Sequence, residues 1–329
     1  MPSKTKTAVV ALALILGGDS SLLAQQKGQY VPGQVGLNAG LIPDPGFAYG
    51  NMTLNYSASR LNNSSANAVS GISGTYGFWA NENFFYYVPH FKVLGGHFAP
   101  FVILPFANGS LTAAGPFGIA PFGINAGGAG LADMWVQPIN IGWHFSRVDF
   151  SAGDGFVAPT GRYSSVPGTT NNVGSGYWGN DVTTGTTLYL TKNKGTTANL
   201  FTDWEVHGKK QGTNLTPGQT FTDEWGIGQV FPLGRQGHTF FQIGVVGYDQ
   251  WQVGSNGGTT QLGIPGRLVP FYSAHAIGVQ SNLIVPAKGL YFYFKYEPEY
   301  LARATTQGRT FVFGGSWNLR FPKEQAPKP

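Results

Sequence analysis

Apolar and polar residues alternate one by one along many segments of the chain. In residues 289–300, apolar or aromatic side chains occupy every second position, and Lys295, Glu297 and Glu299 all fall between them. A period of two indicates a β-strand whose neighbouring side chains point to opposite sides of a sheet. The apolar face of such a strand can pack in the core of a soluble sandwich or face the lipid around a membrane barrel.

Charged residues keep to one face in other predicted strands as well. In residues 198–207, Asp203, Glu205 and His207 share one face, while Leu200 and Trp204 lie on the other. A Lys or Arg side chain on the lipid face of a membrane barrel costs roughly 2–4 kcal/mol at the bilayer midplane. The segregation therefore favours a barrel with an apolar outer face and a polar lumen.

The connections between predicted strands alternate between long and short ones. Outer-membrane barrels have an even strand number, short periplasmic turns and long extracellular loops. We therefore predict an all-β fold, a single antiparallel up-and-down transmembrane β-barrel of about 12 strands. The predicted strands are residues 46–57, 72–94, 97–107, 131–146, 148–160, 181–191, 197–207, 219–232, 239–252, 270–285, 289–300 and 309–321. The predicted long loops are about 58–71, 108–130, 161–180, 208–218, 253–269 and 301–308.

Composition also favours membrane strands. Only 11% of the 329 residues are charged, 14% are aromatic, and the chain has 49 Gly and no Cys. A soluble domain usually carries about a quarter of its residues as charged, and no run approaches the roughly 20 apolar residues of a transmembrane helix. A soluble sandwich is the alternative. Several aromatic residues at predicted strand ends, Tyr86 and Trp135 among them, are expected in the girdles at the membrane interfaces.

The N-terminus has the order of a secretory signal. Lysines precede an apolar run from Ala8 to Leu16, and small residues follow near Ala24, which predicts a signal peptide over residues 1–24. A short membrane anchor is the alternative. Residues 25–45 are predicted as a periplasmic or lumen-inserted segment, 46–321 as the barrel and 322–329 as a C-terminal tail. Without residues 1–24 the chain keeps 18 basic and 14 acidic residues, a charge of +4, which is too mild to indicate nucleic-acid binding.

The last predicted strand contains GGSWNLRF, in which Gly is followed by alternating aromatic or apolar residues up to Phe321. This pattern resembles the signal that outer-membrane assembly machinery reads on a last strand, although here PKEQAPKP follows it. The predicted partners are outer-membrane lipid, that machinery and a small-molecule solute, with no nucleic acid. The predicted location is the outer membrane of a Gram-negative bacterium.

Longer stretches resemble one family of outer-membrane proteins, the family named for the MetA-pathway of phenol degradation. The resemblance covers about residues 28–321, and the run from Asn172 to Val230 is its most specific part. It implies a membrane β-barrel that passes aromatic or other hydrophobic small molecules, and it brings no catalytic residues. The other stretches that carry it are GQYVPGQVGLNAGLIPDPGFAYGN, ADMWVQPINIGWHF, FVAPTGRY and VVGYDQWQV.

The candidate solute-lining residues mix aromatic faces with charges of both signs. Such a lining can pass a small amphipathic solute by stacking and hydrogen bonding, or its charges can simply pair across strands and solvate the interior. The lining candidates are Asp203, Glu205, His207, Tyr248, Gln250, Tyr291, Tyr293, Lys295 and Glu297.

Two further segments leave alternatives open. Gly28–Asp44 folds into or beneath the lumen or forms a periplasmic tail, and the apolar loop Ala113–Gly130 folds inward or forms a surface entry.

Signs of catalysis are weak. Asp203, Glu205 and His207 could ligate a metal from one strand face, but such groups occur in any polar lumen, and we predict no metal and no cofactor. Ser273 and His275 share a face, which makes a membrane hydrolase conceivable. The chain has no phosphate loop, dinucleotide fingerprint or Cys/His zinc spacing. We therefore predict a non-enzymatic, passive outer-membrane channel for small aromatic or amphipathic molecules. A closed structural or surface-interaction barrel is the alternative.

Overall fold

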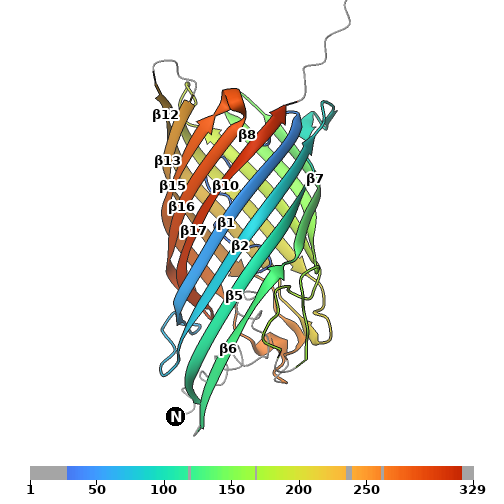
Figure 1. The fold of residues 1–329 in the computed structure, drawn as a ribbon, viewed down its shortest axis with the longest axis vertical. Helices are drawn as coiled ribbons and strands as arrows, with labels where there is room; N and C mark the ends of the chain where they lie inside the picture. Colours follow the sequence, from blue (N-terminus) through green and yellow to red (C-terminus); the bar gives the residue numbers. More distant parts are fainter. Residues whose placement is uncertain (1–27, 118–119, 167–168, 235–238, 261–262, 321–329) are drawn as a thin grey trace, which may run out of the picture.

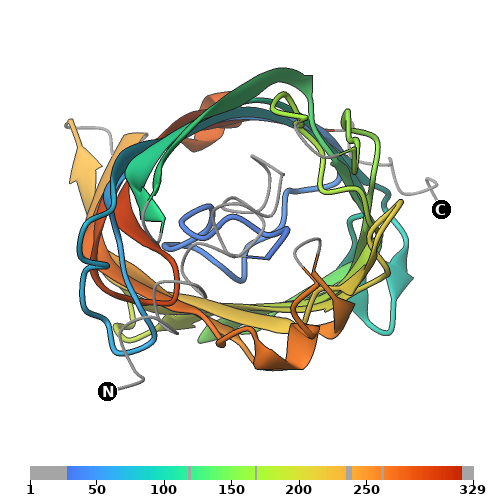
Figure 2. The ribbon, with the colours of Figure 1, turned by 90° about the horizontal axis from the view of Figure 1, so that it is seen from below.

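Twelve long strands close into an antiparallel barrel in the computed structural model (Figures 1 and 2). The structure describes residues 28–117, 120–166, 169–234, 239–260 and 263–320. The predicted signal peptide and C-terminal tail lie outside these ranges. The barrel strands are β1 (Gly46–Leu61), β2 (Ser73–Val88), β5 (Phe101–Phe117), β7 (Met134–His144), β8 (Val148–Ala158), β9 (Gly179–Tyr189), β10 (Thr196–His207), β12 (Thr220–Leu233), β13 (Thr239–Gln252), β15 (Ser273–Val285), β16 (Leu290–Arg303) and β17 (Thr306–Arg320).

The first and last strands close the barrel. β1 pairs with β17 from Gly46↔Arg320 to Leu61↔Thr306, and β5 pairs with β7 over three residues. Every strand pair is antiparallel, and neighbours along the chain are neighbours in the wall. The predicted fold class is confirmed.

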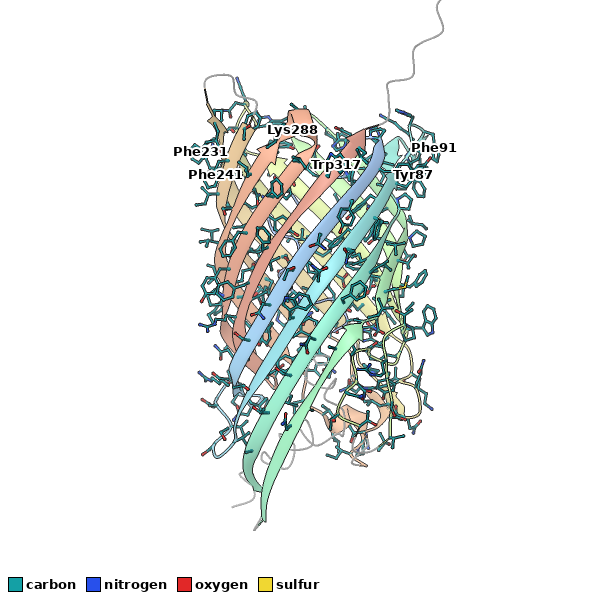
Figure 3. All side chains as sticks on the ribbon, in the orientation of Figure 1. Tyr87, Phe91, Phe231, Phe241, Lys288 and Trp317 are labelled. Carbon is teal, nitrogen blue, oxygen red and sulfur yellow. The ribbon has the colours of Figure 1, made fainter. Side chains whose placement is uncertain are left out.

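Side chains alternate between an apolar outer face and a polar interior, as the period of two predicts. On β16, Phe292 and Phe294 are 41% and 45% exposed, whereas Lys295 and Glu297 are fully buried. At the short-turn end, the exposed aromatic residues Tyr87 and Trp317 lie near one rim of the outer face (Figure 3). Aromatic side chains at that level are typical of the membrane interface.

The region predicted as a long loop over residues 108–130 is a pair of strands, which corrects the prediction. β5 extends to Phe117 and pairs with β6 (Ala120–Leu131), and this hairpin projects beyond the rim of the barrel (Figure 1). Its sequence is rich in Gly and Ala, which are depleted in strands. Its two faces therefore differ too little in polarity for an alternating pattern to indicate strands there.

The connection predicted over 301–308 is also shorter than expected. β16 ends at Arg303 and β17 begins at Thr306, so only two residues separate them. Thr, Gln and Gly near Gly308 suggested a loop, but residues 306–310 pair with β1. The remaining elements are small: β3 (Lys92–Val93), β4 (Gly96–Phe98), β11 (Asn214–Thr216), β14 (Gly257–Thr259) and the 3-10 helices η1 (Gly266–Leu268) and η2 (Pro286–Lys288).

Residues 28–45 run through the interior of the barrel before β1 begins (Figure 2). At one end, Gln29 donates to Ser175 Oγ in the loop before β9. At the other, Asp44 O accepts a hydrogen bond from Asn318 near the end of β17. The segment, called the plug below, therefore extends from the long-loop side to the short-turn side.

Candidate functional site: the lumen and its plug

A buried carboxylate, Glu224 on β12, fixes the middle of the plug. Its Oε1 accepts hydrogen bonds from Tyr30 Oη at 2.5 Å, Gly33 N at 2.8 Å and Gln34 N at 3.0 Å, and its Oε2 accepts one from Val35 N at 2.9 Å. Lys295 Nζ lies 3.4 Å from the same Oε2 and donates to Val35 O at 2.9 Å. A buried ion pair is tolerated only when further hydrogen bonds satisfy both charges, and here the plug backbone supplies them.

Glu205 on β10 holds the start of the plug in the same way. Its Oε1 accepts hydrogen bonds from Gln29 N and Tyr30 N, both at 2.7 Å. Tyr177 lies beside this contact, because Gln29 Nε2 donates to its carbonyl at 3.1 Å. Burial raises the pKa of the Tyr177 phenol well above its ordinary value, and the Glu205 carboxylate raises it further. The phenol therefore stays protonated across the physiological range.

Neutral side chains of the wall bind the later part of the plug. Leu37 N donates to Gln280 Oε1 at 3.0 Å, and Gly40 N donates to Thr187 Oγ1 at 3.0 Å. A Cβ at Gly40 would lie only 2.1 Å from the carbonyl oxygen of Asp149. Glycine is therefore needed where the plug backbone approaches the wall.

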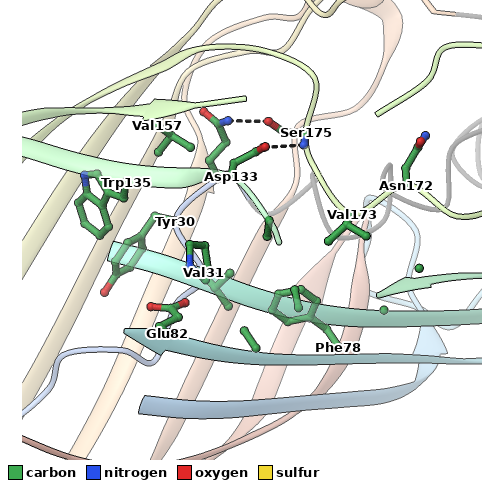
Figure 4. A pocket seen from close by; sticks show the side chains of 18 of the residues that line it. Tyr30, Val31, Phe78, Glu82, Asp133, Trp135, Val157, Asn172, Val173 and Ser175 are labelled. Carbon is green, nitrogen blue, oxygen red and sulfur yellow. Dashed lines mark hydrogen bonds between the residues drawn. The ribbon is translucent and has the colours of Figure 1, made fainter. Parts of the chain in front are cut away.

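The plug lines several cavities in the lumen, among them the two that follow. The larger, of about 510 Å³, lies toward the short-turn end, where Pro286 and Asn318 line it. The smaller, of about 140 Å³, lies toward the long-loop end, where Asn172 and Ser175 line it (Figure 4). Both cavities are lined by Tyr30, Gln34, Ile103 and Trp135. These four residues form the partition between the two cavities.

Aromatic rings surround the partition and the larger cavity. Tyr30 packs edge-on against Trp135 with ring centroids 5.7 Å apart, and it lies 5.5 Å from Phe201. Phe101 contacts Trp135 at 5.8 Å and Tyr86 at 4.7 Å. The larger cavity can therefore offer ring faces and edges to a flat solute, and few charged groups point into it.

The structure separates the nine predicted lining residues by role. Tyr291 and Tyr293 line the larger cavity. Glu205, Lys295 and Gln250 instead contact the plug, and the last donates to Tyr30 O at 3.3 Å.

The other four predicted residues are mostly engaged with the wall. Tyr248 Oη donates to Glu299 at 2.9 Å, Glu297 lies 3.6 Å from Lys295 Nζ, and His207 Nδ1 contacts Gly218 O at 2.8 Å. Asp203 is fully buried on β10. Contact of any of the nine residues with a solute stays a prediction.

Sequence reasoning missed the residues that divide the lumen. Tyr86 and Trp135 were expected in interface girdles, yet both line the larger cavity, so that expectation is wrong for them. A register irregularity lies between Val136 and Ile139 on β7. The extra residue at this irregularity changes which positions face inward. A strict alternation counted back from the outward-facing Ile139 therefore places Trp135 on the outer face, whereas it faces the lumen.

The conceivable hydrolase pair has a different setting. His275 Nδ1 lies 2.6 Å from Asp249 Oδ1, and its ring packs near Trp251 and Tyr300 at 5.4 and 6.2 Å. Ser273 and His275 pair with Trp251 and Asp249 on β13. Those positions alternate with the inward-facing Tyr248 and Gln250, so the pair lies on the outer face of the wall.

The model of the family described as the MetA-pathway of phenol degradation matches residues 58–313. The chain belongs to this family. No curated protein sequence matches it significantly. The family, the closed barrel and the apolar outer face together place the chain in the outer membrane of a Gram-negative bacterium.

Solved structures of other proteins share the fold of this family member. The COG4313 outer membrane channel from Pseudomonas putida F1 matches with a TM-score of 0.64 and 13% identity, over 88% of this chain and 100% of that one. The β domain of the Bordetella autotransporter BrkA matches with a TM-score of 0.53 and 10% identity, over 84% of this chain and 100% of that one. At these identities the likeness shows the barrel fold.

Proposed function

We propose that the protein is a passive outer-membrane channel for small aromatic or amphipathic molecules. The observation that carries the proposal is the pair of cavities separated by a partition of Tyr30, Gln34, Ile103 and Trp135. A solute that crosses the barrel passes from one cavity to the other at this partition. The membership of the MetA-pathway family and the likeness to an outer membrane channel support the proposal.

The size and lining of the larger cavity favour a small ring-containing solute. Its volume of about 510 Å³ falls within the roughly 300–1,000 Å³ of small-molecule sites. Aromatic pairs prefer offset or edge-on contacts at centroid distances of about 4.5–7 Å. Tyr86, Phe101, Trp135 and Tyr291 give a solute several such contacts in sequence, each weak enough to release it.

The closed barrel remains the second candidate, and one observation favours it. The plug is bound along its length, through Glu205, Glu224, Gln280 and Thr187. If this binding is permanent, the lumen stays divided and the long loops carry the function.

Uptake into liposomes separates the two candidates. The refolded protein is reconstituted, and entry of a phenolic acid is compared with entry of a neutral sugar of similar size. We expect faster entry of the aromatic acid, and a further increase in Tyr30→Ala, which removes a ring from the partition. Tyr87→Ala is the matched control, since Tyr87 is 45% exposed on the outer face and lines neither cavity. Folded barrels with no uptake above empty liposomes would refute the channel and favour the closed barrel.

A further inference from the structure

Three acidic side chains meet on the lumen wall beside the start of the plug. Asp181 on β9 lies directly opposite Glu205 on β10 in the strand register, and Asp203 lies two residues away on the same face. One carboxylate oxygen from each residue lies within 4.8 Å of the others. Their exposed fractions are 1%, 0% and 0%. The cluster therefore gathers three buried carboxylates at one point of the lumen wall.

Most oxygens of this cluster lack a partner. Among the described residues, no hydrogen-bond donor reaches either oxygen of Asp181 or of Asp203, or Oε2 of Glu205. Only Glu205 Oε1 is satisfied, by two plug amides. Lys295 is engaged elsewhere, with Glu224 and Glu297. Burying an ionised carboxylate without a partner is strongly unfavourable, so the cluster requires either protons or a cation.

Two neutral oxygens at the start of the plug also lack partners in the described part of the chain. They are Gln29 Oε1 and Tyr177 Oη, and the Tyr177 side chain is 1% exposed. Gln29 Nε2 donates to Ser175 Oγ at 2.7 Å and to Tyr177 O at 3.1 Å, which fixes the amide and directs Oε1 away from both. A Cβ at Gly179, two residues before Asp181 on β9, would lie 2.0 Å from this Oε1. The unpartnered amide oxygen is an observation independent of the acidic cluster.

We propose that Asp181, Asp203 and Glu205, together with the Gln29 amide oxygen, bind one Ca²⁺ ion. Calcium takes six to eight oxygen ligands at about 2.3–2.6 Å, so two ligands on opposite sides of the ion lie about 4.6–5.2 Å apart, close to the spread of this cluster. Zinc prefers nitrogen and sulfur ligands. The imidazole nitrogen His207 Nε2 lies 3.7 Å from Glu205 Oε1 but is not among the ligand atoms that lie within 4.8 Å of one another, and the oxygen-only set favours the harder ion.

The ion has a route to the site and a structural consequence there. Asp181 lines the smaller cavity, which reaches toward the long-loop end. The ligands come from β9, β10 and the plug, so the bound ion links the plug to the wall at Gln29. Calcium removal therefore loosens the start of the plug while the hydrogen bonds at Glu224 persist. This inference does not depend on the solute proposed above.

The test uses the refolded full-length protein in detergent, treated with EDTA and then titrated with CaCl₂. We expect one Ca²⁺ per chain by isothermal titration calorimetry, and a rise in Tm on the order of 5 °C at about 100-fold excess over Kd. Asp203→Asn is expected to weaken Ca²⁺ binding at least about tenfold. Because this change removes an unpaired buried charge, its Tm in EDTA is expected to equal or exceed that of the wild type.

The matched control is Asp223→Asn, which makes the same substitution on β12. Asp223 pairs with Thr202 across the strands, so it lies on the opposite side of the wall from Asp203, and its Ca²⁺ response is expected to equal the wild type's. A wild-type barrel with no Ca²⁺ binding up to about 5 mM, beyond the weakest extracellular sites, would overturn the proposal and assign protons to the cluster. Undiminished binding in Asp203→Asn would also overturn it. The wild-type titration decides the question even if the variant does not fold.

Discussion

Replacement of Glu224 by Gln tests whether the buried ion pair holds the plug in the lumen. Glu224 accepts four hydrogen bonds from the plug and lies 3.4 Å from Lys295. Gln has one acceptor oxygen and no charge. If that oxygen takes the place of Oε1, the hydrogen bond from Val35 N is lost, and if it takes the place of Oε2, the other three are lost. In either case Lys295 loses one of its two carboxylate partners.

The size of the effect follows from these losses. Removing one partner of a buried ion pair costs about 3–5 kcal/mol. Hydrogen bonds to a charged group contribute about 1.5–3 kcal/mol each and are not additive with the pair. Glu297 remains 3.6 Å from Lys295 and still compensates part of its charge, so we take about 4 kcal/mol, the middle of the range for the ion pair, as the loss in free energy of plug binding. A loss of this size changes the ratio of bound to released plug by roughly a thousandfold. The segment from Tyr30 to Val35 is then expected to detach part of the time.

Single-channel recording in planar bilayers measures this release. We expect larger or more frequent conductance steps in Glu224→Gln than in the wild type, with unchanged heat-modifiable mobility of the barrel. Asp223→Asn, one residue away on the outer face, is expected to leave conductance unchanged. The double variant Glu224→Gln/Lys295→Met is expected to be less stable than Glu224→Gln alone, because buried Glu297 then loses the lysine that lies 3.6 Å from it. Identical conductance in the wild type and Glu224→Gln would show that the ion pair does not hold the plug.

Two further substitutions test the wall and the plug separately. Phe292→Arg places a charge on the lipid face at a cost of roughly 2–4 kcal/mol if it lies near the midplane, so the folded fraction in a heat-modifiability assay should fall. Tyr293→Arg faces the lumen and should fold, and equal behaviour of the two would contradict the assignment of faces. Gly40→Ala brings a Cβ to 2.1 Å from Asp149 O, so the plug should become more sensitive to protease while the barrel persists. Gly109→Ala, where no atom lies within 4 Å of the new Cβ, should leave protease sensitivity unchanged.

The strands and their faces could be predicted because alternation is a local property. The division of β16 between lipid and lumen follows from adjacent residues, and burial of Lys295 and Glu297 agrees with it. Local patterns failed where both faces carry small side chains, as in β6, and where an irregularity changes the alternation, as in β7 between Val136 and Ile139. The inward position of Trp135 depends on that irregularity, which the sequence does not reveal.

The partners of the lumen residues were beyond sequence reasoning for a different reason. Glu224 and Gly33 are 191 residues apart, and Gly40 and Thr187 are 147 apart. No periodicity links such positions. The polar alternation on β12, with Thr220 and Thr222 before Glu224, shows that this carboxylate faces inward, but its role in binding the plug becomes visible only when the barrel closes.

The position of the plug ahead of β1 constrains the order of assembly. β1 and β17 pair to close the barrel. The plug therefore enters the lumen either before these two strands pair or through one end of the closed barrel. A finished cylinder without the plug would leave Glu224 and Lys295 facing each other without the amide and carbonyl groups that complete their hydrogen bonds. Folding of the wall around the plug avoids that intermediate. Closure of the β1–β17 seam with residues 28–45 already inside would complete these hydrogen bonds in the same step.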